Sequence, residues 1–198
     1  MADMFYTIAS PSEAQYTEKR SKFLGFAFPV STAAEAKEVV AQMQKRYYDA
    51  RHVCWAYMLG SARDQFLSND NGEPSGTAGK PILGQINSLG LTNVVVVVVR
   101  YFGGIKLGTS GLIVAYRTAA RMALEAAQTV ERHDMARVRF HFPYPAMNSA
   151  MKLTKDFDVA VVEREFDNTC TLTLEINADS APALRARIAD IDGATLID

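Results

Sequence analysis

Cysteine is scarce in this sequence, and it has no hydrophobic run long enough for a membrane helix. The 198-residue chain contains two cysteines, Cys54 and Cys170, which lie far apart and form no CxxC pair. The longest apolar stretches, 23–30 and 94–99, fall far short of the roughly 20 residues that a membrane helix requires. The first four residues include an acid where a signal peptide needs basic residues. We therefore expect a cytoplasmic protein without disulfides and without a membrane partner.

The composition is that of an ordinary globular protein, with 48% hydrophobic, 10% aromatic and 22% charged residues. A folded chain of this length buries about 70% of the surface that it exposes when unfolded. It therefore needs neither disulfides nor a structural metal for a stable core. The length allows one large domain or two small ones.

Charge is divided unevenly along the chain. Residues 1–130 contain 13 basic and 10 acidic residues, a net charge of +3, whereas residues 131–198 contain 8 and 12, a net charge of −4. The isoelectric point of the whole chain, near 6.3, lies below the value of about 9 that is typical of dedicated nucleic-acid-binding domains. The asymmetry favours two units with different partners, and unequal surface charge without functional meaning is the alternative.

Local patterns predict an α+β fold for the first unit. Thr32 and Glu35 form a capping box, which places a helix directly after residue 32. Six consecutive valines predict a strand that is covered on both faces. The expected elements are strands at 22–30, 52–59 and from Asn93 through the valines, and helices from Ala33, at 82–88 and from Thr109-Ser110 to about 128. Residues 60–81 read as a long loop without regular structure.

The last 68 residues repeat a compact rhythm of strands and helices. We expect strands at 138–142, 159–166, 169–176 and 194–197, with helices at 145–155 and 181–188. The order βαββαβ is the ferredoxin-like split motif, an antiparallel sheet with both helices on one face. We therefore divide the chain into domains 1–130 and 131–198.

The first loop with unusual chemistry spans residues 70–81. Its glycines let backbone amides turn inward beside a helix start, an arrangement that binds anions. Pro74 and Pro81 replace the first glycine and the magnesium-binding hydroxyl of a nucleotide P-loop, so that motif does not match. A tight, solvated turn is the alternative interpretation. The candidate ligand-binding residues of this loop are Asp70, Asn71, Glu73, Ser75, Gly76, Thr77 and Lys80.

The second loop, residues 100–111, follows the valine strand. It has the order of strand, glycine-rich turn and capped helix in which anion sites recur. Four glycines between positions 103 and 111 exceed the needs of a turn and indicate a binding surface. Two cations bring charge, and Tyr101 or Phe102 is suited to stack on a base. The candidates here are Arg100, Tyr101, Phe102, Gly103, Gly104, Lys106 and Gly108.

Outside these loops the sequence offers little catalytic chemistry. Arg51 and His52 begin a strand that could neighbour either loop, although a half-buried strand end is the alternative for His52. Neither HExxH, clustered His/Asp spacing nor a GxSxG elbow is present, so we assign no catalytic residue, metal or cofactor. Cys54 lies inside an apolar strand and reads as an inert buried thiol.

Three ordered motifs carry a resemblance to a known family. The segments 51–57 (RHVCWAY), 70–81 and 96–111 together resemble the IMPACT/YigZ family, and the similar part spans about residues 18–128. The tail, 131–198, resembles the extra domain of the bacterial members by pattern more than by motif.

The resemblance implies a fold for each domain and a function linked to translation. The first domain is expected to share the α+β fold of the second domain of a small-subunit ribosomal protein, with a left-handed βαβ crossover, contrary to the usual hand. The tail is expected to be similar to the last domain of the translocase elongation factor. The eukaryotic family member regulates translation by binding the scaffold that activates the amino-acid-starvation kinase. Bacteria lack that pathway, so the resemblance transfers translation-linked binding without a named partner or catalytic residues.

Three hypotheses for function follow. The leading one is a non-catalytic binding protein linked to translation, which binds RNA or a ribosome-associated protein through the two loops. The second is an enzyme acting on a phosphorylated or nucleotide-like small molecule, in which Asp70 and Glu73 hold Mg²⁺ or, with His52, move a proton. The third is a protein–protein adaptor. The sequence leaves the oligomeric state open.

Overall fold

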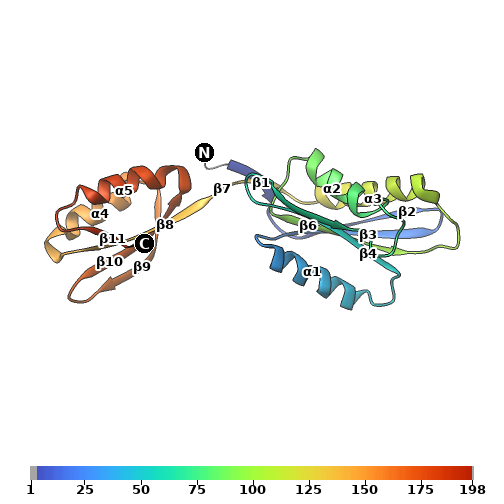
Figure 1. Ribbon diagram of the computed structural model, residues 1–198, viewed down its shortest axis with the longest axis horizontal. Coiled ribbons are helices and arrows are strands. Elements are labelled where there is room, and N and C mark those ends of the chain that lie inside the picture. The colour runs from blue at the N-terminus through green and yellow to red at the C-terminus, as the bar shows by residue number, and fades with distance from the viewer. Residues whose placement is uncertain (1–3, 198) are drawn as a thin grey trace. The chain divides into compact units, whose positions relative to one another are not determined.

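The computed structural model describes residues 4–197, which form two compact units (Figure 1). One unit comprises Phe5–Arg132, and the other begins at His133 and includes Met4. Within residues 4–197, no helix is both long enough and apolar enough to cross a membrane.

The first unit is built on a five-stranded sheet in the order β2-β3-β6-β4-β5, in which all neighbouring strands are antiparallel. Its strands are β2 (Ser12–Glu18), β3 (Ser21–Pro29), β4 (His52–Leu59), β5 (Gln65–Asn69) and β6 (Val94–Tyr101). Two short strands, β1 (Met4–Ile8) and β7 (Thr129–His133), form a separate pair.

Three helices cover both faces of this sheet (Figure 1). Helix α1 (Ala33–Arg46) packs on one face, and α2 (Gly79–Ser88) and α3 (Gly108–Glu125) pack on the other. Helix α1 connects β3 to β4, which run parallel with β6 between them, and this is the crossover for which the resemblance implies a left-handed path.

The predicted capping box begins α1. The Glu35 amide donates to Thr32 Oγ1 at 3.1 Å, and the Ser31 amide donates to the Glu35 carboxylate at 2.7 Å. One unpaired amide of the first helical turn and the amide of the residue before the N-cap are thereby satisfied, so the sequence interpretation of this terminus is confirmed.

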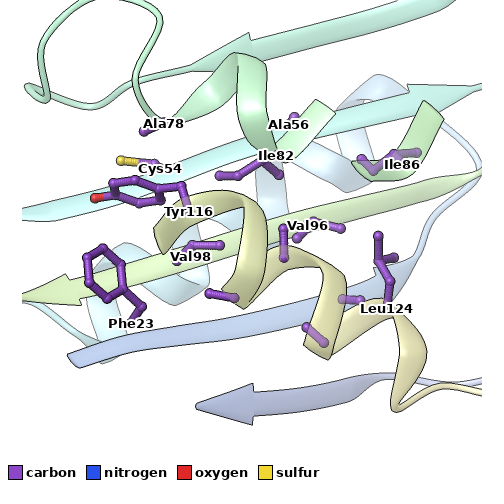
Figure 2. Close-up of a cluster of buried hydrophobic side chains, with 14 of the residues drawn as sticks. Phe23, Cys54, Ala56, Ala78, Ile82, Ile86, Val96, Val98, Tyr116 and Leu124 are labelled. Carbon is purple, nitrogen blue, oxygen red and sulfur yellow. The ribbon is translucent and has the colours of Figure 1, made fainter. Parts of the chain in front are cut away.

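The valine strand β6 is the centre of the core. All six valines are inaccessible to solvent. Val95, Val97 and Val99 pack in the α1 layer, and the alternate valines pack in the α2/α3 layer. Figure 2 shows the second layer, where Val96 and Val98 lie among side chains of α2 and α3. The prediction of a strand covered on both faces is confirmed, and each valine contributes about 1.5–3 kcal/mol by its burial.

Three expectations for the first unit were wrong. Residues 60–81 contain strand β5, which lies at the sheet edge and is mostly exposed, so it lacks the alternation that identifies a strand. Helix α2 begins at Gly79, three residues earlier than expected. Helix α3 begins at Gly108 and ends at Glu125, and no side chain caps its N-terminus, because Leu107 occupies the cap position.

The second unit has the predicted ferredoxin-like arrangement, with sheet order β11-β8-β10-β9 and all pairs antiparallel. Its elements are β8 (Met135–Phe142), α4 (Met147–Asp156), β9 (Val159–Phe166), β10 (Cys170–Asn177), α5 (Ala181–Ala189) and β11 (Thr195–Ile197), with short 3₁₀ turns at Tyr144–Ala146 and Ala178–Ser180. Apolar side chains from one face of this sheet pack against α4 and α5.

Two glycine substitutions test the packing of α3 on the sheet. A Cβ at Gly25 in β3 would lie 2.5 Å from the Ala119 carbonyl oxygen of α3, so Gly25→Ala forces the helix backbone away. We expect a loss of about 1–3 kcal/mol in the free energy of unfolding. Gly84→Ala is the matched control, because Gly84 is exposed in α2 with open space around it and gains up to about 1 kcal/mol from helix propensity.

The measurement is urea denaturation followed by the fluorescence of Trp55, the single tryptophan, which is buried in the first unit. A Gly25→Ala variant as stable as the parent would show that α3 does not approach β3 this closely.

Candidate functional site

The two glycine-containing loops border one cavity of about 380 Å³, which we call the loop cavity. It is lined by Arg51, His52, Glu73, Pro74, Arg100, Phe102, Lys106, Leu107, Gly108, Thr109 and Leu112. Sheet register explains the convergence, because His52 at the start of β4 pairs with Arg100 near the end of β6. The structure therefore brings seven of the sequence-predicted site residues together: Arg51, His52, Glu73, Arg100, Phe102, Lys106 and Gly108.

A buried ion pair joins the two loops across this cavity. Arg100 Nη1 lies 2.7 Å from Glu73 Oε1, and the side chains are only 8% and 3% exposed. The Tyr116 hydroxyl of α3 donates to the same carboxylate oxygen at 2.7 Å. Burial, together with the neighbouring Cys54 and Glu73, raises the pKa of Tyr116 far above its ordinary value, so Tyr116 stays a donor. Glu73 is thereby held by two partners from two different elements.

Arg100 also carries a hydrogen-bond donor that is not used. Its Nε is buried and has no acceptor among the described residues. The guanidinium lies between two rings, with Cζ 5.7 Å from the centre of Phe23 and 5.5 Å from the centre of Phe102. Cation–π contacts of this kind hold the guanidinium in place. An unpaired buried donor costs about 1–3 kcal/mol, a cost that the folded protein carries at this position.

His52 is oriented by the first loop. Its Nδ1 lies 2.8 Å from the Asn71 carbonyl oxygen, and its Nε2 lies 3.9 Å from Glu73 Oε2. The Asn71 side chain in turn accepts from the Val53 amide at 2.8 Å. A neutral His52 that donates from Nδ1 leaves Nε2 as an acceptor at the cavity, and a protonated His52 pairs with Glu73. The role of Asn71 is therefore to position His52 and to join the loop to β4.

The amide nest expected in the first loop is present, but the protein's own Asp70 occupies it. Asp70 Oδ1 accepts from the amides of Ala78 and Gly79 at 3.0 and 2.8 Å, and Oδ2 accepts from the Gly76 amide at 2.9 Å. Burial alone would raise the pKa of Asp70, but these amides and the Lys80 charge together hold the pKa below its ordinary value. The nest closes the loop on itself and is not open to an external anion.

The suggested acid pair is not assembled either. Asp70 binds loop amides and Glu73 binds Arg100 and Tyr116, so the two carboxylates have separate partners. Within residues 4–197, no group of three or more His, Cys, Asp or Glu side chains is arranged to hold a metal ion. Asp70 and Glu73 therefore do not form the acid pair on which the magnesium hypothesis was based.

The remaining sequence candidates lie outside the cavity lining. Thr77 is buried and donates to the Pro74 carbonyl at 2.6 Å, a contact within the loop, and Ser75 and Lys80 are exposed. The hydroxyl of Tyr101 donates to Asp49 at 2.8 Å, and partial burial together with that bond raises the pKa of Tyr101 to about 12.

The glycines of the second loop are required by its backbone conformation and by close packing. Gly104 and Gly108 have φ values of +88° and +72°, which disfavour any other residue. Gly103 packs directly on the backbone of Arg20, where a Cβ would collide. The predicted excess of glycine therefore has two physical causes, left-handed backbone and close approach.

Sequence reasoning missed Tyr116 and Phe23 as parts of the site. Helical spacing assigns Tyr116 to the core, and its ring is indeed buried beside Phe23 (Figure 2). Its hydroxyl, however, reaches Glu73, which no spacing along the chain indicates. Several cavity-lining positions lie on α3 or directly before it. Which of them face the cavity depends on where the helix begins and how it is oriented in the folded protein, and the sequence does not show this.

The cavity is electropositive. Arg51, Arg100 and Lys106 face one acid, Glu73, so the lining carries a net charge of about +2 with His52 neutral. The N-terminus of α3 borders the same space without a side-chain cap, and the helix dipole adds positive potential there. The chemical capability of this arrangement is to hold an anionic group, with a guanidinium, an ammonium and backbone amides as donors.

The chain is similar to known proteins over most of its length. The Impact N-terminal domain matches residues 19–124. The Bacillus subtilis (strain 168) IMPACT family member YvyE is 39% identical over 135 residues, which are 68% of this chain and 62% of that protein. The Escherichia coli (strain K12) IMPACT family member YigZ is 30% identical over 190 residues, which are 95% and 93% of the two chains. A crystal structure of a hypothetical protein has a TM-score of 0.76 and 28% identity, and covers 100% of this chain and 98% of that one.

Replacement of Asp70 by asparagine tests the closed nest. An asparagine side chain has an NH₂ group in place of one carboxylate oxygen, and this group faces backbone donors that it cannot accept from. We therefore expect Asp70→Asn to lower the free energy of unfolding by about 1–3 kcal/mol at pH 7. Because the pKa of folded Asp70 lies below 3.8, its charge stabilises the protein above that pH. This contribution is lost as the pH falls through the folded pKa.

The difference between parent and Asp70→Asn should therefore be constant between about pH 5 and 7 and shrink below about pH 3.8. Urea denaturation followed by Trp55 fluorescence measures it. Asp64→Asn, at an exposed position before β5, is the control and should stay within about 0.5 kcal/mol of the parent. A pH-independent difference would contradict a charged Asp70 in the nest.

Proposed function

The chain belongs to the IMPACT family, and from this premise we propose that it is a non-catalytic binding protein linked to translation, which holds a phosphate group of RNA in the loop cavity. The observation that carries the proposal is the pair of exposed cations, Arg51 and Lys106, which flank the buried guanidinium of Arg100 at the cavity. Guanidinium groups and helix N-termini are the donors that recur at phosphates in proteins.

The division of charge supports placing the RNA on the first unit. Glu73 neutralises Arg100 within the cavity, so Arg51 and Lys106 supply the attraction that an external phosphate experiences. In the described part of the second unit, the exposed sheet face carries acids and bases that pair with one another, including Arg137 with Glu175 and Arg139 with Glu165, each at 3.2 Å. That face offers a polyanion no comparable excess of positive charge.

The link to translation rests on the family resemblance. The eukaryotic member to which the motifs are similar regulates translation, and the ferredoxin-like tail resembles a domain of a translation factor. Both support a role at or near the ribosome.

The second candidate, an enzyme for a phosphorylated small molecule, is favoured by one specific observation. His52 has Nδ1 bound to a carbonyl oxygen and Nε2 directed towards the cavity and Glu73, the orientation of a general base. Glu73, however, is already bound by Arg100 and Tyr116, which leaves it unsuited to exchange protons. We therefore favour a binding function over a catalytic one.

A charge-removal experiment tests the proposed function. Affinity for a fluorescein-labelled single-stranded RNA of about 12 nucleotides is measured by fluorescence anisotropy between about 50 and 200 mM salt. Arg51→Gln/Lys106→Gln should weaken binding on the order of tenfold and reduce the slope of log K against log salt by about 0.7, because the one phosphate contact that is lost contributes about 0.7 on a single strand. Lys37→Gln/Lys45→Gln removes the same charge from exposed positions on α1, across the sheet, and should leave affinity within about twofold.

Other outcomes would reject this function. Equal affinity in the two double variants, or a salt slope near zero, would show that the loop cavity does not bind RNA phosphate. Turnover of a panel of phosphoesters and nucleotides that is abolished by His52→Gln would support the enzyme. A co-purifying protein whose capture survives nuclease treatment and depends on Arg51 and Lys106 would support the adaptor.

A further inference from the structure

A second recess shares Phe102 with the loop cavity. It has a volume of about 440 Å³ and is lined by Gln15, Arg20, Lys22, Leu24, Tyr101 and Phe102. Both charged side chains among these lining residues are basic, and both are exposed. None of the residues other than Tyr101 and Phe102 was a sequence candidate. The surface around Phe102 therefore has cations on two sides, Arg51 and Lys106 at one recess and Arg20 and Lys22 at the other.

The backbone sets the position of Arg20 relative to Phe102. Lys19 and Arg20 both have positive φ values, 44° and 63°, and form the tight two-residue turn between β2 and β3. Gly103, the residue after Phe102, packs against this turn so closely that a Cβ would lie 2.1 Å from the Arg20 carbonyl carbon. The Gly103 amide also donates to Ser21 Oγ at 3.2 Å. Strand pairing of Lys22 with Tyr101 continues the same contact.

Phe102 is the aromatic ring of this region that is free to stack. Phe102 is 47% exposed, and Arg100 Cζ lies 5.5 Å from the centre of its ring and supports the ring from the protein. Tyr101, by contrast, is partly buried and its hydroxyl is bound to Asp49. Exposed aromatic rings beside cations are the features by which proteins bind unpaired bases, because every base has a π-face that stacks without regard to sequence.

From this geometry we infer that the two recesses form one track for single-stranded nucleic acid, with a base stacked on Phe102 and successive phosphates at the two pairs of cations. The inference rests on the proposed function and adds to it the strandedness, the stacking residue and a second phosphate position at Arg20 and Lys22. A duplex does not fit this role, because its bases are already stacked and paired and none is free to stack on Phe102.

The test uses the full chain and four probes. Fluorescein-labelled oligouridylate of about 12 nucleotides and an RNA duplex of about 12 base pairs are titrated by anisotropy at about 100 mM salt, and the single strand is repeated from about 50 to 200 mM. UMP and an acidic peptide, labelled poly-glutamate of about 12 residues, complete the set. The track predicts that the single strand binds more tightly than the duplex, and that UMP competes weakly because it reaches only one recess.

Three variants probe the track residues. Phe102→Ala should weaken oligouridylate binding by about fivefold to a hundredfold and leave duplex binding unchanged, whereas Phe102→Tyr should keep affinity within about twofold. Arg20→Gln/Lys22→Gln should weaken binding and reduce the salt slope by about 0.7, because one phosphate contact is lost. Phe66→Ala, which removes a 58% exposed phenylalanine outside both recesses, is the matched control and should bind as the parent does.

The outcomes separate this inference from the function on which it rests. If Arg51→Gln/Lys106→Gln weakens binding but Phe102→Ala and Arg20→Gln/Lys22→Gln bind like the parent, the track is wrong and the loop cavity alone binds RNA. If the parent does not bind oligouridylate, both proposals fail. Duplex affinity equal to that of the single strand would reject stacking on Phe102. Poly-glutamate binding with the same dependence on Arg20 and Lys22 would assign the surface to an acidic protein partner instead.

Discussion

The buried ion pair between Glu73 and Arg100 is the constraint on which the site depends. Removing two charges from water is costly, and good geometry and additional hydrogen bonds are what offset that cost in a buried pair. Here the Tyr116 hydroxyl donates to the carboxylate and Phe23 and Phe102 enclose the guanidinium, while Arg100 Nε stays without an acceptor among the described residues. The pair therefore joins the first loop, the end of the valine strand and α3 in one fixed arrangement. The pair also neutralises one positive charge, so the attraction of an anionic ligand depends on the exposed cations Arg51 and Lys106.

The parts of the fold that could be predicted from the sequence are those with local signals. The buried valine strand, the Thr32–Glu35 capping box and the βαββαβ order of the tail all follow from periodicity or from residues three positions apart. Strand β5 had no such signal, because an exposed edge strand buries neither face consistently. Sheet register also determines that His52 lies opposite Arg100, and register depends on pairing between distant segments.

Residues of both sequence-predicted loops line the loop cavity, and their role in binding stays a prediction. Glycine spacing correctly indicated inward-turned amides in the first loop, but it could not show that Asp70, six residues before Gly76, would reach them first. In the second loop the glycines indicated close approach, and the approaching group is the backbone of Arg20. A glycine-rich loop with an acid nearby has an internal ligand available, and only the folded path of the loop determines whether that ligand binds.

The internal use of Asp70 has a consequence for binding. A loop whose amides are held by its own carboxylate is ordered before any ligand arrives, so its conformational entropy is lost during folding and not during association. Glu73 and Pro74, which follow Asp70 in the same loop, are then already in place at the cavity wall. The second loop is fixed similarly by the contact of Gly103 with the β2–β3 turn. The backbone of both walls is therefore preorganised. The groups near Phe102 that keep conformational freedom are the long, exposed side chains of Arg20, Lys22, Arg51 and Lys106. This freedom suits the four side chains to follow a flexible polyanion.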